Sequence, residues 1–371
     1  MAGWEELYKR KQCSAAEAVR TIKPGSRVFI GTGCGQPQGL VEELVKDDAG
    51  IVDVEVYHLL TQGVAPYIEE KYSRKFRTSS FFIAPNVREG ILSGRGDYVP
   101  IFLSEIPRLF KSGRIPLDVC LIQTSPPDKS GQLSLGVSVD IVKSAVENCV
   151  TVIAEVNERM PRTLGETSIP LEMVDMVVPS DRAVLEYELP QPDDTIRAIA
   201  RNIASLIDDG CTIEVGIGNI PQTVLGFLHD KNDLGVHTEM FNDAIMPLIE
   251  SGVINGRKKT INRGKVTASF CYGTRTLYDY IHENQMFEFR PSEYVNDPFV
   301  IGQHHRMVSI NVAIEIDMTG QVCSDSIGYD FYSGIGGQVD FNRGAARARD
   351  GKAIIALPST AKDGTISRIG P

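Results

Sequence analysis

Two stretches of the chain match each other and decide its fold: Pro24-Gly25-Ser26-Arg27-Val28-Phe29-Ile30-Gly31-Thr32-Gly33 and Asp209-Gly210-Cys211-Thr212-Ile213-Glu214-Val215-Gly216-Ile217-Gly218. Each is followed by a Pro-Gln pair, at Pro37-Gln38 and at Pro221-Gln222. Each reads as a turn, a short apolar strand and a second, glycine-rich turn. We therefore predict that the chain contains the same structural unit twice.

Three further pairs of matching stretches follow in the same order. They are Asp128–Gln132 with Asp317–Gln321, Val139-Asp140 with Val339-Asp340, and Thr151–Ala154 with Ala353–Ala356. One such match arises easily by chance, because short apolar strands and glycine turns are common, but four in sequence do not. Two related domains that face each other favour a ligand cleft between them.

Strand-like runs alternate with amphipathic helical stretches, which is typical of an α/β fold. The predicted strands are 27–30, 52–60, 80–83, 119–124, 150–156 and 174–178, then 212–215, 235–239, 266–271, 307–316 and 353–357. The predicted helices are 15–22, 39–45, 104–111 and 141–147, then 195–207, 222–228, 245–250 and 274–283. The proline-containing, acidic stretch 188–194 reads as a linker. We predict two similar open α/β domains, residues 1–188 and 195–371.

Composition excludes several classes of protein. With 371 residues and a formal charge of −10, the chain is large enough for two cores and lacks the basic footprint of a nucleic-acid binder. Its seven cysteines form no CxxC pair, so neither a disulfide framework nor a metal site is expected. The sequence shows no apolar signal segment and no bilayer-length apolar run, so we expect a cytoplasmic protein without a membrane partner.

Glu239 is the first candidate for chemistry. It is predicted to lie where a strand ends, in Gly-Val-His-Thr-Glu-Met-Phe at 235–241, and the carboxyl ends of strands are where open α/β sheets bind ligands. Beside Met240 and Phe241 its carboxylate would be partly desolvated, hence a stronger nucleophile with a raised pKa. The alternative is an ordinary loop glutamate. His237 reads as a general base, a metal ligand or a packing residue, and packing is expected because no second His or Cys lies at ligand spacing.

Glycine-rich loops are the second candidate. Three glycines within four positions, Gly334, Gly336 and Gly337, would let backbone N–H groups converge on a developing anion. The alternative is a tight strand–helix turn. Gly216-Ile217-Gly218 supplies another such loop in the same half, and Asn311 lies on a strand that would lead towards the cleft. The glycines at 31, 33 and 35 do not match the GxGxxG spacing, so a nicotinamide cofactor is not expected.

At these residues the chain resembles the acetyl-CoA hydrolase/transferase family. The resemblance rests on the motifs at 235–241, 333–341 and 356–362 and, in the first half, at 123–128 and 134–140. It is most similar to the 4-hydroxybutyrate and butyrate CoA-transferase branch, and the resemblance covers essentially the whole chain. It implies two similar open α/β domains with the active site between them.

The resemblance also implies a mechanism. Glu239 would attack an acyl-CoA, giving first an acyl-glutamyl anhydride and then a glutamyl-CoA thioester, with ping-pong kinetics. The amides of Gly336 and Gly337 are the candidates for the oxyanion hole, with Asn311 as a further one, and the loop of Gly216, Ile217 and Gly218 would line the CoA or acyl channel. Acyl-CoA and small carboxylic acids would be substrates, and no tightly bound cofactor is expected.

Two other functions fit the same residues. One is an acetyl-CoA hydrolase that uses Glu239, with water intercepting a covalent intermediate. The other is a non-catalytic sensor that binds a CoA ester. The acyl group and acceptor acid stay open among acetate, butyrate and 4-hydroxybutyrate, and a homo-oligomer is expected on general grounds.

The second unit looks incomplete at its C-terminal end. After the strand at 353–357 it offers no equivalent of the first-half strand 174–178, and family members continue further. We expect a separate C-terminal fragment or a lost segment, without which this chain would be neither stable nor active. Aligning His58 with His237 places Leu60 opposite Glu239, so the first half would form a wall of the cleft and lack the nucleophile.

Overall fold

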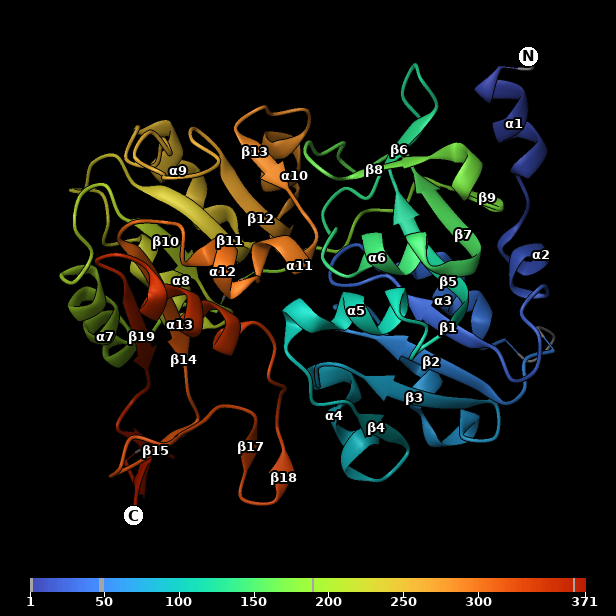
Figure 1. Ribbon diagram of the computed structural model, residues 1–371. Helices are drawn as coiled ribbons and strands as arrows, with labels where there is room; N and C mark the ends of the chain where they lie inside the picture. Colours follow the sequence, from blue (N-terminus) through green and yellow to red (C-terminus); the bar gives the residue numbers. More distant parts are fainter. Residues whose placement is uncertain (1–2, 47–49, 189, 363) are drawn as a thin grey trace.

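The computed structural model describes residues 3–46, 50–188, 190–362 and 364–371. Two parallel sheets form the centre of the molecule, one from each half of the chain, as Figure 1 shows with the first half on the right and the second on the left. The predicted fold class, two similar open α/β units, is confirmed. The stretch predicted as a linker lies between the last strand of the first sheet and the first helix of the second half, and the domain boundary there stays a prediction.

The first sheet has seven parallel strands, in spatial order β4 (Gly96–Tyr98), β3 (Phe76–Ser80), β2 (Val54–His58), β1 (Arg27–Ile30), β5 (Leu117–Thr124), β7 (Cys149–Asn157) and β9 (Met176–Ser180). Its α-helices are α1 (Trp4–Lys11), α2 (Ala15–Val19), α3 (Gln38–Leu44), α4 (Pro85–Leu92), α5 (Ile106–Lys111) and α6 (Val142–Glu147). The central strands are nearly continuous apolar runs because both faces of a parallel sheet are covered.

The second sheet has six parallel strands, in spatial order β13 (Phe287–Phe289), β12 (Val266–Cys271), β11 (Gly235–Phe241), β10 (Thr212–Val215), β14 (Met307–Val312) and β19 (Lys352–Ala356). Its α-helices are α7 (Asp194–Ala204), α8 (Asn219–Leu225), α9 (Met246–Glu250), α10 (Arg275–Ile281), α11 (Ser292–Val295), α12 (Pro298–Ile301) and α13 (Gln338–Arg347). Asp193 caps α7 by accepting a hydrogen bond from the N–H of Ile196.

Short elements complete the chain. The small strands are β6 (Gln132–Ser134), β8 (Ser168–Pro170), β15 (Glu315–Asp317), β16 (Val322–Cys323), β17 (Ser326–Ile327), β18 (Asp330–Phe331), β20 (Thr360–Ala361), β21 (Ile366–Ser367) and β22 (Ile369–Gly370). The 3₁₀ turns are η2 (Pro66–Ile68), η3 (Glu70–Tyr72), η4 (Leu103–Glu105), η5 (Leu171–Met173) and η6 (Asp243–Ile245).

The two sheets share one topology. Read from the same edge, β4, β3, β2, β1, β5 and β7 correspond to β13, β12, β11, β10, β14 and β19. Among the described residues no strand occupies the place beyond β19 that β9 holds beyond β7; instead β22 pairs with β15. The strand register also corrects one alignment. Val28 pairs with Val56 as Ile213 pairs with Val236, which places Leu59, not Leu60, at the position of Glu239.

Two strand predictions differ from the structure. The strand expected at 80–83 is β3 at Phe76–Ser80. Its buried side chains Thr78, Ser79 and Ser80 are polar, so an apolar pattern does not reveal the strand. The strand expected at 307–316 is broken into β14 and β15. Glu239 lies within β11, two residues before its end, and not at the beginning of a loop.

The two halves meet at backbone contacts made by β12 and β13 of the second sheet. The N–H groups of Val139 and Asp140 donate to the carbonyl of Ser269, and Phe289 exchanges hydrogen bonds with the loop at 164–166. Buried apolar side chains continue from one half into the other. The second sheet is therefore held directly against the first half.

Candidate active site

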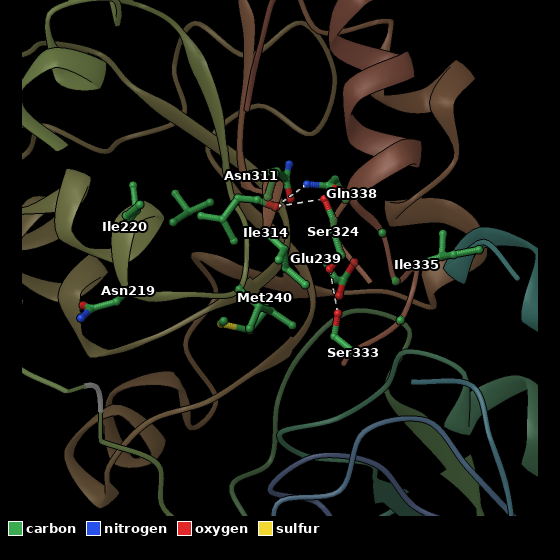
Figure 2. A pocket seen from close by; sticks show the side chains of 18 of the residues that line it. Asn219, Ile220, Glu239, Met240, Asn311, Ile314, Ser324, Ser333, Ile335 and Gln338 are labelled. Carbon is green, nitrogen blue, oxygen red and sulfur yellow. Dashed lines mark hydrogen bonds between the residues drawn. The ribbon is translucent and has the colours of Figure 1, made fainter. Parts of the chain in front are cut away.

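A cavity of about 570 Å³ opens at the carboxyl ends of β10, β11 and β14. Its wall is completed by the glycine loop that leads into α13 and by Phe82 of the first half. Figure 2 shows Glu239, Met240 and Asn311 between Ile220 on one side and Ile335 on the other. Six of the seven residues predicted for the site line this cavity: Gly216, Ile217, Glu239, Asn311, Gly336 and Gly337. Gly218 lies next to the wall, as the residue before α8.

Glu239 is a buried carboxyl with one strong neutral partner. Only 9% of its surface is exposed, and Oε2 accepts a hydrogen bond of 2.8 Å from Nδ2 of Asn296, the residue after α11. Burial raises the pKa of Glu239 from 4.5 to about 7; the Asn296 hydrogen bond acts in the opposite direction, and the nearby charges of Asp340 and Asp140 add to the rise. The carboxylate is therefore poorly solvated and accessible only from the cavity.

Asp140 and Asp340 lie at matching positions of the two halves. Asp340 accepts hydrogen bonds from Oγ and N of Ser104, at 2.9 and 3.1 Å, and so ties α13 to the first half. Asp140 accepts from the hydroxyl of Thr32. Burial raises the pKa of Asp140 to about 6 and of Asp340 to about 7. The repeat had singled out both residues as markers of the duplication, and their place beside Glu239 was missed.

The glycine loop is wedged between Glu239 and the first half. A side chain at Gly337 would collide with the Glu239 carboxylate, and one at Gly334 would press on Phe82. Gly336 has φ +54, a conformation that glycine adopts without strain. Within the described part of the chain, the N–H groups of Gly336 and Gly337 donate no hydrogen bond, so both remain available to a ligand.

The amide of Asn311 is held by the buried carboxyl of Glu214. Nδ2 donates to Oε2 of Glu214 at 3.0 Å, and the same oxygen accepts the N–H of Ile310 at 3.0 Å. Burial and the neighbouring charge of Glu239 raise the pKa of Glu214 well above its usual range. Sequence reasoning missed Glu214, although it stands in the opening motif, because an isolated acid in a short apolar strand gives no signal of its own.

His237 packs behind the nucleophile. Its ring is buried, Nε2 lies 2.8 Å from the carbonyl oxygen of Val295, and its centroid is 4.7 Å from that of His304. Burial lowers the pKa of His237 to about 3, so the ring is neutral. Of the readings open at the sequence level, these contacts fit packing.

The described residues contain neither a metal-binding cluster nor a membrane-spanning helix. No group of three or more His, Cys, Asp or Glu side chains is arranged to hold a metal ion. In the same residues no helix combines the length and the apolar character needed to cross a membrane.

Comparison with known proteins identifies relatives of the whole chain. Residues 2–186 match the acetyl-CoA hydrolase/transferase N-terminal domain, and residues 273–371 match the C-terminal domain of the same family. The chain is 47% identical to 4-hydroxybutyrate coenzyme A transferase of Clostridium kluyveri over 99% of its length and 86% of the relative's. It is 42% identical to succinyl-CoA:acetate/propanoyl-CoA:succinate CoA transferase of Fasciola hepatica, over 93% of this chain and 73% of that one.

A solved structure gives the same picture. The 4-hydroxybutyrate CoA-transferase of Porphyromonas gingivalis superimposes with a TM-score of 0.86 at 39% identity, over 99% of this chain and 86% of that one. The sequence motifs that suggested this resemblance, in both halves of the chain, therefore pointed to the right relatives.

Proposed function

Because the chain belongs to the acetyl-CoA hydrolase/transferase family, we propose that it moves CoA between a short-chain acyl-CoA and a carboxylic acid. The observation that carries the proposal is the buried carboxylate of Glu239, which lines an apolar cavity against a glycine loop with free N–H groups. Acids of the acetate, butyrate and 4-hydroxybutyrate type are the proposed substrates. The domain limits 1–188 and 195–371 belong to the same proposal.

The proposed reaction passes through two covalent intermediates on Glu239. A carboxylate oxygen attacks the thioester carbonyl carbon, the C–S bond breaks, and CoA leaves as a thiolate from an acyl-glutamyl anhydride. The thiolate then attacks the glutamyl carbonyl, which releases the first acid as its carboxylate and leaves a glutamyl-CoA thioester. The acceptor carboxylate reverses both steps and frees Glu239. No net proton is consumed, and the thioester energy is retained in each intermediate.

The surroundings of Glu239 support nucleophilic attack. A carboxylate is a weak nucleophile in water because water solvates it, and a buried one loses that solvation. With a pKa of about 7, a large fraction of the Glu239 side chains is ionised near neutral pH. The raised pKa also shows that the surroundings stabilise the carboxylate poorly. Asn296 holds one oxygen, so the carboxylate has a fixed orientation towards the cavity.

Charge that develops on the attacked carbonyl oxygen needs donors. The free N–H groups of Gly336 and Gly337 are the proposed oxyanion hole, and Asn311 is a further donor. The loop of Gly216, Ile217 and Gly218 contributes to the wall of the acyl or CoA channel. CoA and its acyl esters enter as substrates, and the proposal requires no resident cofactor.

A trapping experiment tests this function. The protein is incubated with butyryl-CoA, treated with borohydride and analysed by peptide mass spectrometry. We expect a modification at Glu239 after incubation with butyryl-CoA. Loss of butyryl-CoA by turnover is expected only when acetate is added. The matched control is Glu155→Gln, which alters another buried glutamate that does not line the cavity. Turnover by Glu239→Ala at the wild-type rate would contradict the proposal, and acetate-independent loss of butyryl-CoA would identify a hydrolase.

A further inference from the structure

Glu214 lies in the cavity wall without a step assigned to it. Its side chain is 1% exposed, on β10, and its Oε2 bridges the backbone N–H of Ile310 and the amide of Asn311, each at 3.0 Å. A buried donor that loses its partner also loses the hydrogen bond that water would otherwise supply, so such a bond is costly to break. The Asn311 amide is therefore firmly bound on its Nδ2 side.

Gly216 fixes the other side of the same amide. A Cβ at Gly216 would lie 2.6 Å from Oδ1 and 3.2 Å from Cγ of Asn311. The amide thus fits between the carboxyl of Glu214 and the bare backbone of Gly216. Rotation of the amide would break the bond to Glu214 or press the larger NH₂ group on Gly216. Since Nδ2 carries two N–H groups, one of them is not used by Glu214.

The duplication shows that this arrangement is not needed for the fold. Matching the strand registers of the two sheets places Phe29, Leu59 and Ile122 at the positions of Glu214, Glu239 and Asn311. All three first-half residues are apolar and buried. The same three positions, of which Leu59 lies directly after β2, are thus filled by hydrocarbon in one half and by two carboxyls and an amide in the other. Burying such polar groups costs stability, so their joint presence beside one cavity points to chemistry.

We propose that Glu214 is a positioning residue, which holds the Asn311 amide in the one orientation that serves acyl transfer at Glu239. The inference rests on the proposed function. Glu214 acts through Asn311 and forms no bond to the substrate. Its carboxyl supplies a fixed acceptor for two donors, the Ile310 N–H and the Asn311 amide, while Gly216 prevents the amide from turning over.

A double-mutant cycle tests the proposal on CoA transfer from butyryl-CoA to acetate. Removal of an oxyanion donor by Asn311→Ala is expected to lower kcat by roughly 100-fold. Glu214→Ala, which only frees that donor, is expected to lower kcat by about 10–100-fold with KM within about 3-fold. The double variant is expected within about 3-fold of Asn311→Ala, because the second change removes a support that no longer has a function. Effects that multiply would overturn the proposal.

Two variants separate positioning from folding. Glu214→Gln keeps an acceptor oxygen of the same shape and is expected to keep kcat within about 5-fold of wild type. Glu155→Ala is the matched control: Glu155 is 2% exposed and its carboxylate accepts the N–H groups of Gly39 and Leu40 in the first half. It is expected to lower the melting temperature as Glu214→Ala does, without lowering kcat beyond about 2-fold. Equal losses of kcat in Glu214→Ala and Glu155→Ala would assign Glu214 a structural role.

A wild-type protein that transfers no CoA would overturn the proposed function and this inference together. Effects of Glu214→Ala and Asn311→Ala that multiply in an active enzyme would overturn this inference alone.

Discussion

At the residue scale, Asn296 sets how readily Glu239 ionises. Its amide donates to the Glu239 carboxylate at 2.8 Å and is the partner that holds the pKa of Glu239 down against burial. Asn296→Ala removes that bond, so the pKa rises. Because the carboxylate is the reactive form, activity is lost as the pH falls through this pKa, and the loss now begins at higher pH. We expect kcat/KM at pH 6 to fall about tenfold more than at pH 9.

The measurement is the pH profile of kcat/KM for butyryl-CoA. Asn148→Ala is the control, since Asn148, the residue after α6, donates a similar amide hydrogen bond to the carbonyl of Ser144. Its profile should keep the wild-type acid limb. An unchanged acid limb in Asn296→Ala would show that Asn296 does not stabilise the ionised carboxyl.

Glu239 also carries a cost to stability, because its pKa is raised from 4.5 to about 7 in the folded state. The folded state favours the protonated form, so the cost is small below pH 4.5, grows between pH 4.5 and about 7, and is constant above that, where both states are ionised. Glu239→Gln mimics the protonated form. We expect it to stabilise the fold by about 3 kcal/mol at pH 8 and by less than about 1 kcal/mol at pH 5.

Chemical denaturation at the two pH values measures this difference. Glu172→Gln is the control, because it removes a carboxyl at an exposed position on η5. The same gain for Glu239→Gln at both pH values would mean that the carboxyl is not buried as described.

At the scale of elements, the residues that sequence reasoning found and missed differ in kind. The strands β10 and β12 were placed with their observed bounds because apolar residues recur along both. β3 was misplaced because its covered side chains are threonine and serine. Glu239 was found because it lies near the end of a predicted strand and within a family motif. The glycine loop was found from its three closely spaced glycines and a second family motif. Asn296, after the four-residue helix α11, belongs to no repeat and no motif, and only the tertiary fold brings it to Glu239.

The segment 324–337 is the element that closes the cavity from the second half onto the first. It carries β17 and β18 and lies against α4 and β4, as the lower centre of Figure 1 shows. The N–H of Ile335 donates to the hydroxyl of Tyr98 at 2.9 Å, and the rings of Tyr98 and Phe331 are 5.1 Å apart. The backbone carbonyl of Gly336 accepts the N–H of Leu103. This placement brings the glycine amides to the nucleophile.

Tyr98→Phe tests that anchoring. The change removes one hydrogen bond, worth about 0.5–1.5 kcal/mol, and leaves the ring contact. We expect kcat/KM for butyryl-CoA to fall by about 2- to 10-fold, because the glycine amides are held less firmly. Tyr280→Phe is the control, a partly buried tyrosine whose hydroxyl makes no hydrogen bond within the described residues. A loss as large in Tyr280→Phe would show that the segment is anchored by other contacts.

At the scale of the whole molecule, the site depends on how closely the two halves approach. Gly165 of the first half has φ +111 and lies against the backbone of Phe289 in β13. The neighbouring residues complete the junction: the N–H of Glu166 donates to the carbonyl of Phe289, and that of Phe289 to the carbonyl of Leu164, at 2.8 Å each. Arg290 adds an ion pair with Glu166 at 2.9 Å. This junction fixes β13, and with it the second sheet, against the first half.

Gly165→Ala is expected to force the halves apart, because its Cβ would lie within 3.1 Å of three backbone atoms of Phe289. The positive φ adds strain of about 1–3 kcal/mol. Gly113→Ala separates these causes, since Gly113 has φ +67 and open space around it. We expect Gly113→Ala to lower the melting temperature slightly and leave CoA transfer intact. Gly165→Ala should be destabilised by about 2 kcal/mol more and lose CoA transfer at temperatures where it is still folded, because the walls of the cavity come from both halves. Equal behaviour of the two variants would show that the contact at Gly165 does not set the distance between the halves.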